Sequence, residues 1–353
     1  MAVVKLDSFN TDYILQNQSI FKMGLENPEL KITGIAHLSF YQEVIKNKIH
    51  NTIITHSQTL ETDSNDLKPG INETNFITNI SKKNNLTRDY SGKIIHVDKK
   101  ALTDDWEFWK KNKIQDVIPE EYKQKKFIKK YESGLAHFEE GLQNSLSHTL
   151  LLPQIYDVLY DTNRYENPTS STKRQVSKLI DDLSIEYCFY PFYIKEEKDM
   201  LIMCFETRIS NKNQILEKLL PLYKQNKDFS IENYEFKIIT KYFLDPASYK
   251  INYAELNLTE KMHDNLSYSV TINLSEKEYD IEPLKNMVLN VNKDKTYSKE
   301  DYEGINRDSK KETQFDSALE IEKAQKDKSK ESIIMVILIT IILAIIILFL
   351  IYG

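Results

Sequence analysis

The stretch IEYCFYPFYIKEEKDMLIMCFETRI, residues 185–209, contains two aromatic and aliphatic runs separated by five charged residues. Runs of this length and composition are typical of β-strands, and the short polar connection indicates an antiparallel hairpin. Pro191 lies inside the first run. Because proline has no backbone N–H to donate, we expect this strand to lie at a sheet edge or to carry a bulge.

The segments around this hairpin predict a domain over residues 168–291. An amphipathic helix is expected over residues 176–183, and NKNQILEKLLPLYK (211–224) predicts a second one. YEFKIITKYF (234–243) and LSYSVTINL (266–274) are typical of strands. The order helix, strand, strand, helix, strand, strand predicts an α+β domain.

Residues 1–160 predict an N-terminal mixed domain, in which short strands precede helices. LKITGIAHLSFY (30–41), TIITH (52–56) and KIIHV (93–97) are typical of strands. The polar segment 57–92 predicts a long loop. The expected fold class is therefore α+β, a mixed α/β region of one or two domains before a polar stalk and a single C-terminal transmembrane helix.

The helical segment 103–160 carries a candidate interface. Thr103 is expected as an N-cap, and the longest helical pattern runs from Pro119 to Leu152. Its narrow apolar stripe steps by three and four residues, as in a coiled-coil seam, and packing on its own domain is the alternative. The candidate interface consists of Trp106, Trp109, Ile128, Tyr131, Leu135, Phe138 and Leu142.

Eight lysines are interleaved with aromatic residues between Lys110 and Lys130. Such a pattern suits an anionic membrane surface or a protein-docking surface. The third interpretation is that the aromatic side chains face a core and the lysines face water.

No segment of the sequence matches a common catalytic motif. The eight glycines have neither P-loop nor dinucleotide-binding spacing. His137 and His148 share one predicted helix face with Glu140 and Asn144, but eleven residues separate the imidazoles by roughly 16 Å. One metal ion cannot bridge that distance, so a solvated polar face is expected. We predict no catalytic, cofactor or metal site.

The two cysteines, Cys188 and Cys204, lie in the two strands of the predicted hairpin. We expect two small buried side chains. A disulfide or a weak metal site is the alternative if the two residues lie opposite each other.

Residues Ile333–Tyr352 are apolar except for Thr340 and predict a membrane-spanning helix. About 20 helical residues span the roughly 30 Å hydrocarbon core of a bilayer. The polar stalk 292–332 precedes this anchor and ends in lysines, which favour the cytoplasmic side. The N-terminus shows no signal-peptide pattern, so we expect a tail-anchored, single-pass protein whose N-terminal bulk faces the cytoplasm.

These features favour a tail-anchored, non-enzymatic scaffold or interaction subunit of a secretion- or trafficking-type assembly. Its expected partners are the bilayer and other protein subunits, with a second copy of the chain as a further candidate. The net charge is −6 and the charges are mixed, so nothing in the sequence suggests nucleic acid as a partner. The alternatives are a virion surface protein with a C-terminal anchor and a membrane-tethered enzyme with an unfamiliar site.

Overall fold

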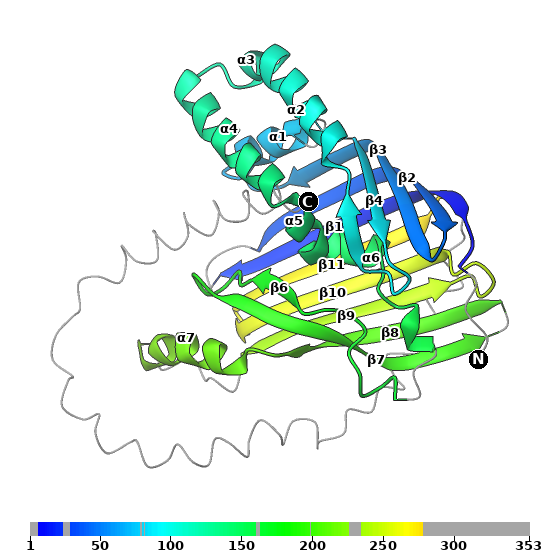
Figure 1. Ribbon diagram of the computed structural model, residues 1–353. Helices are drawn as coiled ribbons and strands as arrows, with labels where there is room; N and C mark the ends of the chain where they lie inside the picture. Colours follow the sequence, from blue (N-terminus) through cyan, green and yellow to red (C-terminus); the bar gives the residue numbers. More distant parts are fainter. Residues whose placement is uncertain are drawn as a thin grey trace. The chain divides into compact units, whose positions relative to one another are not determined.

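The computed structural model describes residues 6–23, 29–77, 80, 82–159, 163–197, 199–225 and 234–277. Eleven strands within these ranges form one antiparallel sheet (Figure 1). Its strand order is β5-β4-β3-β2-β1-β11-β10-β9-β8-β7-β6, which places two meanders side by side.

The first meander contains β1 (Phe9–Met23), β2 (Leu30–Ile45), β3 (Lys48–Thr62), β4 (Lys83–Arg88) and β5 (Ile94–Val97). The second contains β6 (Lys173–Val176), β7 (Ser184–Glu197), β8 (Met200–Ile209), β9 (Glu235–Leu244), β10 (Ile251–His263) and β11 (Leu266–Glu276). Strand β1 pairs with β11 and joins the meanders, so that Leu15 lies opposite Leu274.

The expected fold class is therefore wrong. Strands from residues 1–160 and from residues 168–291 belong to one large antiparallel sheet and do not build two mixed α/β parts. The stalk 292–332 and the expected anchor 333–352 lie outside the described residues. Within the described ranges, no helix is long and apolar enough to cross a bilayer. The predicted domain boundaries stay predictions.

Helices occupy the connections between strands. They are α1 (Lys68–Ile77) after β3, α2 (Lys99–Asn112), α3 (Ile114–Val117), α4 (Glu121–Ala136), α5 (Phe138–Asn144), α6 (Leu146–Leu151) and the 3-10 turn η1 (Asp157–Leu159) after β5, and α7 (Lys212–Gln225) after β8. Helices α5 and α6 contact strands from both meanders, including β5, β6, β10 and β11.

Several local predictions are confirmed. The hairpin at 185–209 forms as β7 and β8, and the register shifts between Pro191 and Tyr193, as expected for a bulge beside proline. Helix α7 and strands β2, β3, β5, β9 and β11 match the predicted segments.

Other local predictions are wrong. The polar segment 57–92 is no long loop, because it contains the end of β3, helix α1 and strand β4. Residues 177–183 contain turns instead of a helix. Helix α2 begins four residues before Thr103, with Asp98 accepting a hydrogen bond from the Lys100 N–H.

The long helix expected from Pro119 to Leu152 is interrupted. Helix α4 ends at Ala136, and the backbone of His137 leaves the helical conformation with φ −102° and ψ 17°. Ser145 then caps α6 by accepting a hydrogen bond from the His148 N–H at 3.3 Å. The stripe Ile128-Tyr131-Leu135-Phe138-Leu142 therefore crosses a break between two helices.

The two faces of the sheet differ in polarity. Along β10, Ala254, Leu256 and Leu258 are buried, whereas the intervening Glu255 and Asn257 are half-buried. Because alternate residues of a strand point to opposite faces, this pattern places the core on one side of the sheet. Helices α5 and α6 contribute to this core through Leu142, Leu150 and Leu151.

Candidate functional site: a cavity between the sheet and the helices

A cavity of about 460 Å³ lies between the sheet and the helices. Its lining comes from strands β1 to β4 and β11, from helices α4 to α6, and from residues 174–184. This volume falls within the range of about 300–1,000 Å³ that is usual for small-molecule sites. The cavity is therefore the candidate functional site.

The floor of the cavity is formed by inward-facing side chains of neighbouring strands, among them Leu15, Ala36 and Ile272. Leu15 lies opposite Ala36 on β2, so small and large side chains alternate across this floor. Gly34 lies opposite Asn17. A β-carbon at Gly34 would stand 2.4 Å from Asn17 Oδ1 and 2.6 Å from Leu60 Cδ2, so only glycine fits here without movement.

Some residues of the candidate interface belong to the helical wall of the cavity, and others pack behind it. Trp106 and Trp109 are buried and stack with ring centroids 5.6 Å apart, and Tyr131 stacks on Trp106 at 4.1 Å. Ile128, Tyr131 and Leu135 pack against this aromatic cluster. Four of the seven residues line the cavity, namely Tyr131, Leu135, Phe138 and Leu142. Whether any of the seven also contacts a partner stays a prediction.

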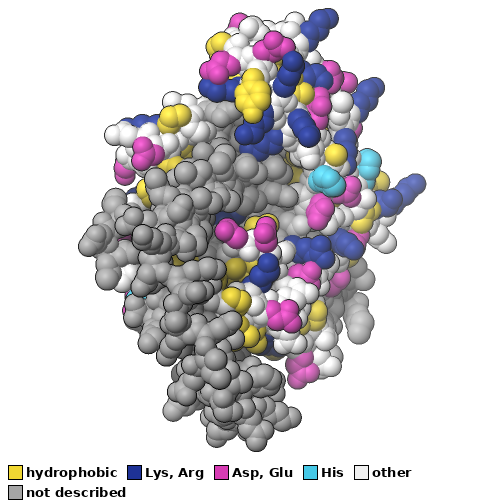
Figure 2. Space-filling view, turned by 90° about the vertical axis from the view of Figure 1, so that its left-hand side faces the viewer, with side chains coloured by type: hydrophobic (Ala, Val, Ile, Leu, Met, Phe, Trp, Pro, Cys, Tyr) yellow, Lys and Arg dark blue, Asp and Glu magenta, His cyan; other side chains and the backbone are white. Residues whose placement is uncertain are grey.

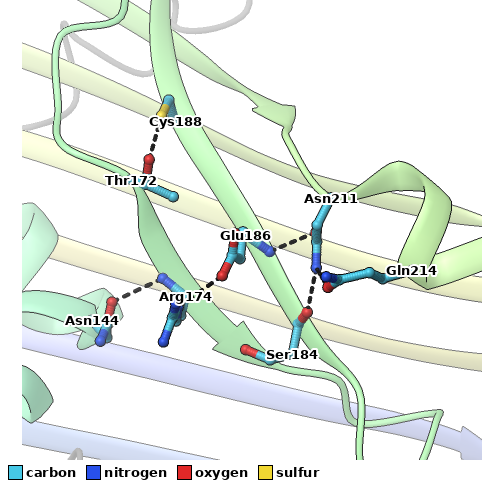
Figure 3. Close-up of polar contacts among 8 residues, drawn as sticks. All are labelled: Asn144, Thr172, Arg174, Ser184, Glu186, Cys188, Asn211 and Gln214. Carbon is cyan, nitrogen blue, oxygen red and sulfur yellow. Dashed lines mark hydrogen bonds and ion pairs between the residues drawn. The ribbon is translucent and has the colours of Figure 1, made fainter.

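Arg174 and Gln175 of β6 are polar residues of the cavity lining, and Figure 3 shows the polar contacts of Arg174. The Arg174 N–H donates to Asn144 Oδ1 of α5 at 2.8 Å, and Arg174 Nε donates to Glu186 Oε1 of β7 at 2.9 Å. Asn211 Nδ2 donates to the Ser184 carbonyl at 2.7 Å. The two bonds of Arg174 tie the short strand β6 to α5 and to β7, and the Asn211 bond holds the start of β7.

Lys178 is the buried charged residue of the cavity lining. Its side chain is 8% exposed, and its Nζ has no hydrogen-bond partner within the described residues. Burial lowers the pKa of Lys178 to about 8, while the nearby charge of Glu260 opposes this. Glu260 is 1% exposed and accepts from Ser177 Oγ, from the Lys178 N–H at 2.8 Å and from Tyr234 Oη at 3.2 Å.

The four polar residues of the predicted helix face do not form one site. His137 is 70% exposed and lies 4.0 Å from Glu140 Oε2. Glu140, Asn144 and His148 instead line the cavity, and the expected solvated position is wrong for the half-buried His148. Burial, and secondarily the charge of Lys173, lowers the pKa of His148 to about 4, which keeps the imidazole neutral. Within the described ranges, no cluster of ligands suits a metal ion.

The two cysteines do not lie opposite each other. Cys188 pairs with Arg208 in the hairpin register, and Cys204 pairs with Tyr193. Neither forms a disulfide. Cys204 is buried and Cys188 is half-buried, so the expectation of a small buried side chain is confirmed for Cys204.

Asn17, Asn84 and Lys178 were missed in the sequence, although each lines the cavity and carries a buried polar atom without a hydrogen-bond partner among the described residues. Asn17 and Asn84 carry this atom as Oδ1. For Asn17 and Asn84 the available signal was a polar residue at an inward position of a strand, whereas Lys178 lies in the segment after β6. That signal needed the strand register, which the sequence did not provide.

No protein-family model and no curated protein sequence matches this chain. A lipovitellin structure concerned with lipid–protein interactions is 10% identical and covers 78% of this chain, with a TM-score of 0.38. The match spans 25% of the lipovitellin chain. DynF of the dynemicin biosynthesis pathway of Micromonospora chersina is 4% identical over 78% of this chain and 83% of its own, with a TM-score of 0.19.

A third structure is an outer membrane lipoprotein-sorting protein domain from Vibrio parahaemolyticus. It is 11% identical over 79% of this chain and 91% of its own, with a TM-score of 0.16. All three TM-scores lie below 0.5, so these likenesses carry no argument about function.

Proposed function

We propose that the protein binds a mainly apolar small molecule in the cavity between its sheet and its helices. The observation that carries this proposal is an open volume of about 460 Å³ with an aliphatic and aromatic lining. Apolar surface that stays unfilled forfeits both dispersion contacts and the free energy of burial. A ligand with an apolar body recovers both.

A membrane tether is the second part of the proposal. The apolar run 333–352 supports insertion into a bilayer, and the lysines that precede it support a cytoplasmic position of the sheet. An anchored binding protein stays close to a bilayer, which is a reservoir of apolar molecules.

Photo-crosslinking tests the cavity. Full-length protein in nanodiscs is irradiated with a photoactivatable hexadecyl probe, and the labelled peptides are mapped by mass spectrometry. Leu15→Trp should reduce labelling of cavity peptides several-fold, because Leu15 is half-buried and lines the cavity. Ile14→Trp is the matched control on the opposite face of β1. Equal labelling of both variants would contradict the proposal.

The tether is tested by deleting residues 333–353. The full-length protein should remain in the membrane pellet after carbonate extraction, whereas the shortened protein should be released. Protease added to sealed cells should leave residues 6–277 intact. A shortened protein that stays in the pellet, or cleavage of the sheet from outside, would contradict the tether or its orientation.

An interaction subunit is a second candidate function, favoured by two exposed aromatic side chains. Phe108 of α2 is 65% exposed and Tyr122 of α4 is 78% exposed. Figure 2 shows hydrophobic side chains among lysines at the top of the view, where α2, α3 and α4 lie. Exposed aromatic residues are frequent binding hot spots. To test this function, proteins that co-purify with the chain in stoichiometric amount are compared between wild type and the variants Phe108→Ser and Tyr122→Ser. The variants should lose the co-purified subunit while their melting temperature stays unchanged.

A further inference from the structure

The buried charges of the described residues are strongly unequal in sign. Four cationic side chains are buried, namely Arg88, Lys173, Lys178 and Lys241, whereas Glu260 is the one buried acid. Lys241 has its own partner, Glu255, at 3.3 Å. Of the remaining cations, Lys173 begins β6 and Lys178 follows it by five residues, and only Lys178 of these two lines the cavity.

The Lys173 ammonium donates hydrogen bonds to neutral groups. Its Nζ donates to the Gln143 carbonyl at 2.6 Å and to Thr149 Oγ1 at 3.1 Å. These partners supply hydrogen bonds but no negative charge. The positive charge of Lys173 therefore remains uncompensated by them.

The Glu260 carboxylate accepts no hydrogen bond from the Lys178 ammonium. It already accepts hydrogen bonds from Ser177 Oγ, from the Lys178 backbone N–H and from Tyr234 Oη. The Lys178 ammonium itself makes no hydrogen bond to a described residue. An ammonium has three donors, and enclosing it without acceptors is costly.

Cationic side chains also outnumber acidic ones in the lining of the cavity. Lys130, Arg174 and Lys178 are cationic, and Glu140 is acidic. Arg174 is bound to Glu186, so Lys178 is the enclosed cation on this wall. Lys178 lines the cavity while its Nζ lies buried behind the lining, so rotation of its side chain would bring the ammonium to an acceptor that enters the cavity with a negative charge.

We propose that the ligand of this cavity is an amphiphile with an acidic headgroup, a carboxylate or a phosphate, which binds Lys178 while its apolar chain lies between the sheet and helix α4. This inference rests on the proposed binding function and adds the ligand class. An acidic headgroup supplies Lys178 with both acceptors and countercharge. Hydrogen bonds to charged groups contribute about 1.5–3 kcal/mol, which is roughly a ten- to hundredfold difference in affinity.

The test compares three photoactivatable probes with the same chain, namely hexadecanoic acid, hexadecyl phosphate and hexadecanol. Each is added at pH 7 to full-length protein in nanodiscs of a neutral lipid, and cavity peptides are quantified. At least one acidic probe should label about tenfold more strongly than the alcohol. Whichever of the carboxylic acid and the phosphate labels the cavity more strongly identifies the headgroup.

Lys178→Met should remove this preference, so that the acidic probes label no more strongly than the alcohol, and Lys178→Arg should retain it. Lys129→Met is the matched control, because Lys129 is an exposed residue of α4 outside the cavity lining. Lys178→Gln is a second neutral variant if Lys178→Met lowers the melting temperature.

Three outcomes separate this inference from the proposed function. If no probe labels the cavity, the binding function itself is wrong. If all probes label equally, the cavity binds apolar molecules but the acidic headgroup is wrong. If the acidic preference survives in folded Lys178→Met and Lys178→Gln, the assignment to Lys178 is wrong.

Discussion

Gly34 of β2 lies directly opposite Asn17 of β1, and its missing side chain provides the space in which Asn17 Oδ1 lies. Both residues line the cavity. Glycine weakens a strand interior, and it commonly marks a place where another group approaches the backbone closely. Here the approaching groups are the side chains of Asn17 and Leu60.

We predict that Gly34→Ala displaces both neighbours. The new methyl group would stand 2.4 Å from Asn17 Oδ1, which is far inside van der Waals contact. Both approached atoms are the far ends of flexible side chains, so relieving this overpacking should cost at most about 1–3 kcal/mol, and the displaced side chains would also narrow the cavity. Labelling by the hexadecyl probe should fall together with the urea midpoint of unfolding.

The rescue variant is Gly34→Ala with Asn17→Ala. Removing the Asn17 side chain removes the shortest contact, so the double variant should be more stable than Gly34→Ala alone. If the double variant instead loses as much stability as Gly34→Ala and Asn17→Ala together, the two side chains do not compete for this space.

The sequence predicted those elements whose signal lies within a few residues. The hairpin β7–β8 depends on two neighbouring runs and a short connection, and the bulge follows from Pro191. The sheet itself depends on the pairing of β1 with β11, in which Leu15 meets Leu274. No local pattern reports a pairing between segments so far apart, so the predicted mixed α/β fold class was wrong.

The candidate site was predicted in part for the same reason. Helical spacing places Tyr131 and Leu135 on one face of α4, and both pack against the cluster that contains Trp106 of α2. Asn17 reaches the cavity through the register of β1, and Lys178 reaches it through the turn after β6. Neither residue has neighbours in the sequence that reveal its burial.

Leu135→Asp and Phe138→Asp test whether the helical wall serves the cavity or a partner. Both side chains line the cavity, so a carboxylate there should reduce labelling by the hexadecyl probe several-fold. The domain should also melt at a lower temperature, because a charge placed on a half-buried apolar surface loses solvation.

Exposed Phe108 provides the matched control for this pair. Phe108→Asp should leave melting and probe labelling unchanged, because its side chain is 65% exposed. If Leu135→Asp and Phe138→Asp instead abolish association with a second chain while melting and labelling are retained, the stripe is a partner interface.

His148 should make stability depend on pH. Its pKa is about 4 in the folded protein, against an ordinary value of 6.5. Between these values the unfolded chain binds a proton that the folded protein does not, so stability falls as the pH is lowered from about 6.5 to about 4. At about 1.4 kcal/mol per pKa unit, the full contribution is roughly 3 kcal/mol.

His148→Gln removes this group, so the difference in unfolding free energy between wild type and variant should change by that amount between pH 7 and pH 4. His137→Gln is the control, because His137 is 70% exposed. Parallel pH curves for wild type and His148→Gln would show that His148 titrates normally in the folded protein.

Arg88 connects the sheet to the segment that follows the helices. Its guanidinium donates to Asn51 Oδ1 at 2.8 Å, to Gln42 Oε1 at 3.0 Å and to the Pro153 carbonyl at 3.3 Å. The side chain is 1% exposed. Arg88→Met would leave these three buried acceptors without their donor, and each unsatisfied acceptor costs about 1–3 kcal/mol.

We therefore predict a loss of at least about 3 kcal/mol for Arg88→Met. Arg88→Lys should recover only part of it, since an ammonium cannot reproduce the planar fork of donors. Arg174→Met is the control, because its exposed pair with Glu186 should contribute less than about 1 kcal/mol. The two tryptophans of the chain, Trp106 and Trp109, report urea unfolding by fluorescence. Equal losses for Arg88→Met and Arg174→Met would show that the buried guanidinium does not hold this segment on the sheet.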